Sequence, residues 1–360
     1  MLTASRLEVS LLISLPRARL PNGRVTMAGN QKAPVHIIFI GAGAVGCFYA
    51  SRLHYPEHGV HVSLVARSNY AAIQKDGVKM ETHSFGDYLF RPHAVFPSAD
   101  EAAKSASAAG HAWDYVVVTT KALPERGDAS ALIQPSSAPP PPSSSSRTAA
   151  VTVISAEQTA PGIVRQNRWT RISIGPYTDG RGTGDEGTAR AGDRAVADIG
   201  RWWGDLGSIR DVDPHDEIDL QLVRWHKLCI NSAMNPSAVL SGGRGNADMV
   251  ADAELREHLT GVMDEIRAAV PKILGRPFPD SLATPDRIIR STERNTGSKP
   301  SMLLDWEAGR PMELEVILGN PVRIARERGA SLPRMQTLYA LLRSAQEARE
   351  RSKSDGKGRL

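Results

Sequence analysis

VHIIFIGAGAVGCFYASRL, residues 35–53, is the stretch that decides the fold. Its first six residues form a nearly continuous apolar, β-branched run, which is typical of a strand buried on both faces. Gly41, Gly43 and Gly46 follow at once, and the remaining residues continue with helical spacing. Further strand-like runs at 60–65 and 115–118 are separated by helix-forming segments, so the sequence predicts an α/β domain with a doubly wound, mostly parallel sheet.

The glycine-rich turn matches the fingerprint of dinucleotide-binding proteins. In that fingerprint the first glycine permits a tight turn, the second lets the backbone approach a pyrophosphate, and the third lets helix and strand pack closely. A turn of this composition without a ligand is the alternative, but the strand before it and the helix after it favour binding. The predicted cofactor-binding residues of the turn are Gly41, Ala42, Gly43, Ala44, Val45 and Gly46.

The residues that follow the next two strands indicate which dinucleotide binds. Arg67 stands 21 residues after Gly46, where an NAD site places a carboxylate for the ribose hydroxyls. A guanidinium there suits a 2′-phosphate, so the sequence predicts NADP(H), unless Arg67 is only a solvated loop charge. Lys121 follows the third strand on the ligand side of the sheet, where it is either a cofactor contact or an ordinary surface lysine.

Composition excludes several classes of protein. A chain of 360 residues with 41% hydrophobic and 23% charged residues is typical of a two-domain soluble protein. No run approaches the ~18 apolar residues that span a bilayer, and two cysteines, Cys47 and Cys229, predict reduced thiols. The net charge is +5, but residues 1–33 contribute +4 and residues 341–360 contribute +3, so the rest carries −2. A nucleic-acid partner is therefore not expected.

The sequence divides into two predicted domains with terminal extensions. Residues 1–33 are expected to lie outside the fold, as a disordered extension of a cytoplasmic protein or as an Arg-rich mitochondrial presequence. Residues 34–212 are predicted to bind the cofactor, and residues 213–350 are predicted to form a helical substrate domain. Residues 351–360 are predicted to be a basic tail. Whether the helical half pairs with a second copy is left open.

Several shorter segments complete this division. PSSAPPPPSSSS at 135–146 is low-complexity and predicts a stiff, solvated insert. The remaining expected elements are strands at 151–155 and 172–175, a glycine-rich loop at 180–192, and helices at 216–235, 247–270 and 312–329.

A polar stripe marks the first long helix of the second domain. Lys227, Asn231 and Asn235 are spaced four apart and share one helix face, whereas the other directions are largely apolar. A polar stripe on a buried helix is costly unless it lines a site, and a lysine held there can act as a general acid. A solvent-facing stripe on an amphipathic helix is the alternative.

A second cluster contains Ser301, Asp305 and Glu313. Pro311 and Glu313 fit the start of a helix, which explains Glu313 without any ligand. The glycines and proline around these carboxylates also suit a turn that faces a ligand.

Five blocks of sequence together resemble the ketopantoate reductase (2-dehydropantoate 2-reductase) family. They occur in order as IIFIGAGAVGCFYASRL, VSLVAR, VVVTTKA, WHKLCINSAMNPSAVL and PSMLLDWEAGRPMELEVILGNPVRIA. The resemblance implies a Rossmann domain, an all-helical C-terminal domain and an active site in the cleft between them. It also implies NADPH-dependent reduction of ketopantoate, a small 2-oxo acid, in pantothenate and coenzyme A biosynthesis.

The resemblance assigns roles to the polar residues of the helical half. Lys227 would be the general acid that protonates the carbonyl oxygen as hydride reaches C2. Asn231 and Asn235 would hold the substrate and Ser301 would bind its carboxylate. Glu313 would hydrogen-bond to the substrate hydroxyl or the cofactor, and Asp305 would support the cluster.

One departure from the family separates the functional alternatives. The family carries an Asn-Gly turn after its fifth strand, and no Asn-Gly occurs between Lys121 and Trp225. Residues 135–150 stand in place of that strand, its turn and the next helix, so either VTVIS (151–155) replaces the strand or the fold is compromised. The alternatives to a ketopantoate reductase are a paralogous NADPH-dependent 2-oxo acid or ketone reductase and a catalytically impaired NADP-binding protein.

Overall fold

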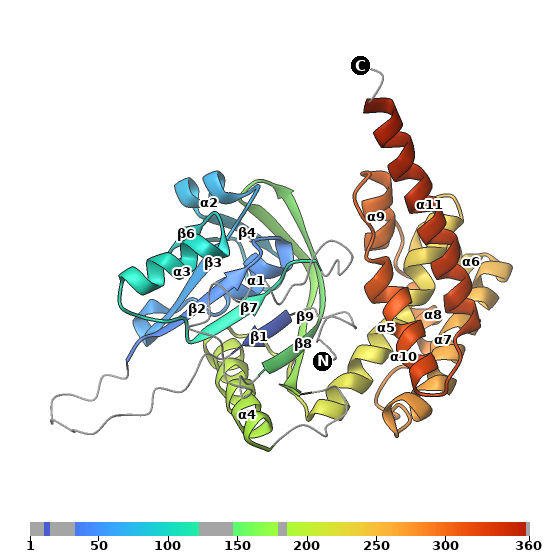
Figure 1. The fold of residues 1–360 in the computed structure, drawn as a ribbon, viewed down its shortest axis with the longest axis horizontal. Helices are drawn as coiled ribbons and strands as arrows, with labels where there is room; N and C mark the ends of the chain where they lie inside the picture. Colours follow the sequence, from blue (N-terminus) through green and yellow to red (C-terminus); the bar gives the residue numbers. More distant parts are fainter. Residues whose placement is uncertain (1–10, 15–32, 122–146, 179–185, 358–360) are drawn as a thin grey trace. The chain divides into compact units, whose positions relative to one another are not determined.

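The computed structural model describes residues 11–14, 33–121, 147–178 and 186–357, which form two compact units (Figure 1). Described residues up to Leu220 form a unit built on a sheet, and those from Gln221 onward form a helical unit. The low-complexity insert predicted at 135–146 lies outside the described residues.

The first unit contains a single mixed sheet with a parallel centre. The predicted strands at 35–40, 60–65 and 115–118 are confirmed as β2, β3 and β7, and they pair in parallel in the order β7-β2-β3. The sheet order is β5 (Tyr88–Phe90), β4 (Val78–Thr82), β9 (Ile163–Tyr177), β8 (Arg147–Ala160), β1 (Leu11–Ser14), β7 (Tyr115–Val118), β2 (Val35–Ile40), β3 (Val60–Val65) and β6 (Val95–Phe96), with β10 (Val212–Pro214) beside β9.

Both faces of the parallel centre are covered, which explains its continuous apolar sequence. Ile37 and Phe39 of β2 are buried in one core with residues of α1 (Ala44–Ser51) and α4 (Glu186–Arg201). Ile38 and Ile40 are buried in a second core with α3 (Ala99–Ala108). Alternate side chains of one strand thus enter opposite layers, as expected for a doubly wound sheet.

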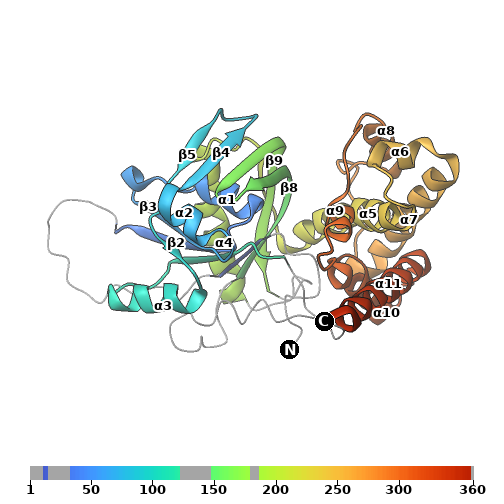
Figure 2. The same ribbon diagram turned by 90° about the horizontal axis from the view of Figure 1, so that it is seen from above.

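The strands expected at 151–155 and 172–175 are parts of a much longer antiparallel pair, β8 and β9, which lies beside β4 and β5 (Figure 2). The prediction of a glycine-rich loop at 180–192 is wrong for its second half, because α4 begins at Glu186. Helix α4 buries Ile199 among the residues of the first core. Burial of this face outweighs the cost of about 1 kcal/mol for each glycine inside a helix.

The prediction that residues 1–33 lie outside the fold is wrong for part of this segment. Leu11–Ser14 forms β1, which lies between β7 and β8 and is antiparallel to both. Of the two alternatives, replacement of the missing strand by VTVIS does not hold beside β7, since β1 lies there and β8 is one strand further away. Unpaired strand edges carry backbone donors and acceptors that require partners, and the apolar segment LLIS supplies them.

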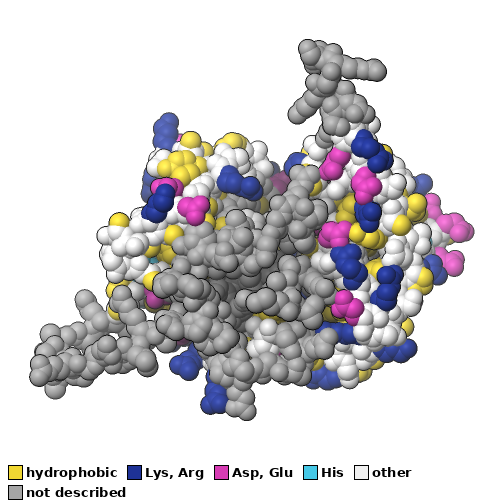
Figure 3. All heavy atoms as spheres, viewed as in Figure 1, with side chains coloured by type: hydrophobic (Ala, Val, Ile, Leu, Met, Phe, Trp, Pro, Cys, Tyr) yellow, Lys and Arg dark blue, Asp and Glu magenta, His cyan; other side chains and the backbone are white. Residues whose placement is uncertain are grey.

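The second unit consists of helices around one apolar core that includes Trp225, Met263 and Leu338. Its described elements are α5 (Glu217–Leu240), α6 (Asn246–Ala251), α7 (Ala253–Leu274), α8 (Pro285–Thr292), α9 (Ser301–Glu307), the π-helical turn η7 (Glu315–Gly319), α10 (Asn320–Glu327) and α11 (Pro333–Lys357). Helix α11 continues to Lys357, so most of the expected basic tail is helical. On the face of this unit shown in Figure 3, basic and acidic side chains are interspersed.

Candidate active site

The glycine-rich turn has the geometry that its sequence predicts. Gly41 has φ +117°, a conformation that side-chain-bearing residues rarely adopt. A Cβ on Gly46 would lie 2.2 Å from the Gly41 carbonyl oxygen, so only glycine allows α1 to pack this closely. In the described part of the chain, nothing lies within 4 Å of the position that a Cβ would take on Gly43. The turn therefore leaves room for a ligand at its middle glycine, next to the first amides of α1.

Arg67 and Lys121 lie at the same edge of the sheet as this turn. Arg67 is exposed just after β3, and Lys121 is exposed just after β7. Because β2, β3 and β7 are parallel, their carboxyl ends meet at one edge, where α/β proteins bind ligands. The structure thus brings together the three predicted elements of the cofactor site.

Two residues of this edge were not predicted from the sequence. The Thr119 hydroxyl donates to the Gly41 carbonyl at 2.6 Å, which holds the first glycine against the end of β7. The buried Asn69 side chain donates to the Ala42 carbonyl at 2.8 Å. The sequence offered two signals for these residues: a hydroxyl residue directly after a strand and an asparagine directly before a helix. Both are common in ordinary turns and so did not single out Thr119 or Asn69.

In the helical unit, the polar stripe lies on α5, and its last residue is more buried than the first two. Lys227 and Asn231 are half-buried, and Asn235 is buried. The Asn235 side-chain oxygen accepts hydrogen bonds from the Met302 amide at 3.0 Å and the Ser301 hydroxyl at 3.3 Å. The structure therefore joins the end of the stripe to the first turn of α9, and brings two predicted substrate-binding residues together.

The carboxylates of the second cluster occupy different environments. Asp305 is only 3% exposed and forms an ion pair with Arg310, with 2.9 Å between Oδ1 and Nε. Glu313 is half-buried and lies just before the helical turn, its carbonyl accepting from the Ile317 amide at 3.0 Å. The expectation that Pro311 begins the helix is wrong, because the helical residues start at Leu314.

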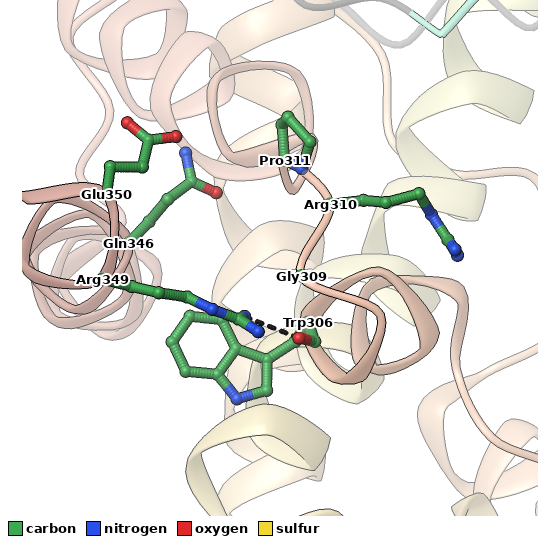
Figure 4. Close-up of a pocket in the computed structure, with 7 residues that line it drawn as sticks. All are labelled: Trp306, Gly309, Arg310, Pro311, Gln346, Arg349 and Glu350. Carbon is green, nitrogen blue, oxygen red and sulfur yellow. Dashed lines mark hydrogen bonds between the residues drawn. The ribbon is translucent and has the colours of Figure 1, made fainter. Parts of the chain in front are cut away.

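A cavity of about 310 Å³ lies next to the segment that precedes Glu313 (Figure 4). Arg349 stacks over the Trp306 ring, 4.3 Å from its centroid, and donates to the Trp306 carbonyl. Gln346 accepts from the Met312 amide at 2.9 Å, which fixes the non-helical path of this segment. The lining residues include none of the predicted site residues; they are Trp306, Gly309, Arg310, Pro311, Gln346, Arg349 and Glu350.

In the part of the chain that the structure describes, the two thiols and the metal-binding residue types show no sign of a reactive centre. Burial raises the pKa of Cys47 and that of Cys229 to about 12, so neither supplies a thiolate near neutral pH. Among the described residues, no group of three or more His, Cys, Asp or Glu side chains is placed to hold a metal ion. No described helix is long and apolar enough to cross a membrane.

These features define a class of protein. A glycine-rich turn at the carboxyl edge of parallel strands, with a helical unit following in the chain, is the arrangement of dinucleotide-dependent oxidoreductases. Members of that class that reduce a carbonyl group to an alcohol catalyse the oxidation of a CH–OH group in the reverse reaction.

Comparison with known proteins identifies the family. The family model described as "Ketopantoate reductase PanE/ApbA" matches residues 37–139, and "Ketopantoate reductase PanE/ApbA C terminal" matches residues 219–346. This chain belongs to the ketopantoate reductase family. The resemblance seen in the sequence is thereby confirmed, as are the α/β and helical halves.

Individual relatives extend over most of the chain. The uncharacterized protein YDL144C of Saccharomyces cerevisiae is 30% identical over 340 residues, covering 85% of this chain and 92% of the yeast protein. A 2-dehydropantoate 2-reductase of Nostoc is 26% identical over 324 residues, covering 84% and 93%. The crystal structure of 2-dehydropantoate 2-reductase from Methylococcus capsulatus aligns with a TM-score of 0.66 at 28% identity, covering 88% and 98%.

Proposed function

We propose that this chain catalyses the NADPH-dependent reduction of 2-dehydropantoate to pantoate. The observation that carries the proposal is the polar stripe of α5, which presents Lys227 one turn before Asn231 and joins Asn235 to Ser301. NADPH, when bound at the glycine-rich turn, supplies the hydride that adds to C2 of the substrate. The Lys227 ammonium donates a proton to the carbonyl oxygen, so the alcohol forms without a free alkoxide.

The remaining residues of the helical unit bind and orient the substrate in this proposal. Ser301 binds the substrate carboxylate, while Asn231 and the Nδ2 of Asn235 hold its polar groups. Glu313 accepts a hydrogen bond from the substrate hydroxyl. Asp305 acts indirectly, because its ion pair with Arg310 stabilises the turn between α9 and Glu313.

The cofactor preference rests on Arg67. The guanidinium follows β3 at the position where a carboxylate would select NAD, so it favours the 2′-phosphate of NADPH. The pyrophosphate would lie at Gly43 and the first amides of α1, and Lys121 would contact the phosphates or ribose from the end of β7.

One observation favours the catalytically impaired alternative. A parallel strand beside β7 would deliver a loop to the cofactor edge, as the family's Asn-Gly turn does. Strand β1 is antiparallel to β7, so its first residue, Leu11, lies at that edge instead. Beside β7, therefore, no described strand ends at the cofactor edge with a turn that could supply the family's asparagine contact.

The decisive experiment measures binding and turnover separately. Titration of NADPH fluorescence reports cofactor binding, and NADPH oxidation at 340 nm with ketopantoate reports reduction. Turnover with ketopantoate supports the proposal, and turnover only with another member of a 2-oxo acid panel supports a paralogous reductase. Tight NADPH binding without reduction of any 2-oxo acid would establish the impaired alternative.

A further inference from the structure

Two amide side chains, the buried Asn69 and the exposed Gln158, hold the glycine-rich turn. Asn69 is 6% exposed and lies directly before α2 (Tyr70–Asp76). Its Nδ2 donates to the Ala42 carbonyl at 2.8 Å and to the Gln158 Oε1 at 2.8 Å. The Gln158 Nε2 donates back to the Asn69 Oδ1 at 2.7 Å. Both donor hydrogens of the Asn69 amide are therefore used, and its orientation is determined by its partners.

A helix-capping role does not account for Asn69. An asparagine directly before a helix ordinarily caps the first turn with its side-chain oxygen. In the described part of the chain, the Asn69 side chain makes no such bond to α2, and its oxygen accepts from Gln158 instead. The side chain reaches away from its own helix towards the turn between β2 and α1.

The bond to Ala42 controls the part of the turn that meets a ligand. The peptide between Ala42 and Gly43 is planar, so the direction of the Ala42 carbonyl determines the opposite direction of the Gly43 N–H. Gly43 is the glycine whose surroundings are open, and its amide belongs to the group that faces a pyrophosphate in such turns. Holding the carbonyl towards Asn69 therefore turns this N–H away from Asn69.

We infer that Asn69 is a positioning residue for the cofactor pyrophosphate, and that Gln158 of β8 holds Asn69 in the required rotamer. The inference rests on the proposed cofactor function. It assigns two separate phosphate groups of the dinucleotide to neighbouring residues with different tasks, because Arg67 meets the 2′-phosphate while Asn69 acts through the glycine-rich turn on the pyrophosphate.

Three ligands separate these tasks. NADPH and 2′-phospho-ADP-ribose contain the pyrophosphate, whereas adenosine 2′-monophosphate does not. We expect Asn69→Ala to weaken the binding of the first two ligands about tenfold, because the peptide that carries the Gly43 N–H is no longer held by Asn69, and to change the binding of the third less than twofold. Gln158→Ala, which leaves the bond between Asn69 and Ala42 possible, is expected to weaken the binding of the first two ligands about threefold. The matched variant Arg67→Ala is expected to weaken all three.

Turnover provides a second measurement. With saturating NADPH, kcat of Asn69→Ala is expected to stay within twofold of the wild type while KM for NADPH rises. Asn69→Ser keeps a hydroxyl in the buried position and replaces Asn69→Ala if the alanine variant does not fold. We expect it to weaken the binding of the same two ligands and not that of the third. Equal weakening of the binding of all three ligands, or no weakening, would overturn the inference. NADPH binding by the wild type would still support the proposed cofactor. Failure of the wild type to bind NADPH would overturn both.

Discussion

Leu12 lies opposite Val118 in one antiparallel pairing and opposite Ala149 in another. A short segment near the N-terminus therefore separates the parallel strands β2, β3 and β7 from the long pair β8 and β9. Its backbone supplies partners to two strands at once, which otherwise would present open edges inside the sheet.

Removal of residues 1–26, which leaves Met27 as the first residue, is expected to destabilise the first unit. Loss of the pairing on both sides of β1 should cost about 2–4 kcal/mol, allowing for the entropy regained by the segment. Thermal unfolding measures the loss, and hydrogen exchange should show faster exchange in β7 and β8. Removal of residues 1–8 alone is the matched control, since it retains β1. Equal stability of the two shortened chains would contradict the role of β1 and leave a cleavable presequence compatible with the fold.

Lys227→Ala tests the proposed general acid. Loss of a positioned proton donor is expected to lower kcat by about 10²- to 10⁴-fold, with little change in NADPH affinity. Steady-state kinetics with ketopantoate and NADPH titration measure the two effects. Lys272→Ala, which changes an exposed lysine of α7, is the control. A Lys227→Ala enzyme with wild-type kcat would exclude this residue as the acid.

Arg67→Ala tests cofactor selection. The loss of a charge-assisted contact to the 2′-phosphate should raise the Kd for NADPH by about 10- to 100-fold and leave that for NADH almost unchanged. Fluorescence titration with both dinucleotides gives the ratio. Arg91→Ala removes another exposed arginine of the same unit and should change neither value. A parallel loss of NADPH and NADH affinity would show that Arg67 does not read the 2′-phosphate.

Gly46→Ala and Gly43→Ala are expected to differ although both alter the same turn. The Cβ on Gly46 meets backbone oxygen at 2.2 Å, so this variant should lose several degrees in Tm as well as cofactor binding. A Cβ on Gly43 has no near neighbour among the described residues, so that variant should keep its Tm and lose affinity for NADPH. Thermal unfolding with and without NADPH distinguishes them. A Gly43→Ala protein that binds NADPH normally would argue against pyrophosphate binding at this glycine.

The stability of the first unit should decrease in mild acid because of His54. Burial, together with the neighbouring His61 and His93 imidazoles, lowers the pKa of His54 from 6.5 to about 4, while Glu57 acts in the opposite direction. The His54 Nδ1 also accepts from the Val62 amide at 3.0 Å, a bond that protonation at this nitrogen removes.

The folded state therefore binds this proton less readily than the unfolded state, and stability falls as the pH decreases from 6.5 towards 4. After allowance for partial solvent exposure, His54 should account for about 1–2 kcal/mol. His54→Asn, whose Oδ1 can accept from Val62, should reduce the pH dependence of the unfolding free energy in urea. The exposed His83→Asn is the control, and identical pH profiles for wild type and His54→Asn would exclude His54 as the source.

Local features of the sequence were sufficient to predict the parallel centre of the sheet and the cofactor turn. Strand β2 is recognisable because both of its faces are buried, and Gly41 and Gly46 because their conformations and contacts exclude side chains. The stripe of Lys227, Asn231 and Asn235 is equally local, since helical periodicity alone places these residues on one face.

Contacts between distant segments decided the rest. Three sets of contacts link residues separated by 27 to more than 100 positions. They are the pairing of Leu11–Ser14 with β7, the bond between Asn235 and Ser301, and the bonds of Asn69 to Ala42 and Gln158. No periodicity records such contacts, because each depends on which backbone group is left without a partner once the sheet and helices have packed. The amino-acid sequence by itself determined the parallel strands, the cofactor turn, the polar stripe and the family, and the tertiary structure determined which strand fills the sheet and which side chains hold the site.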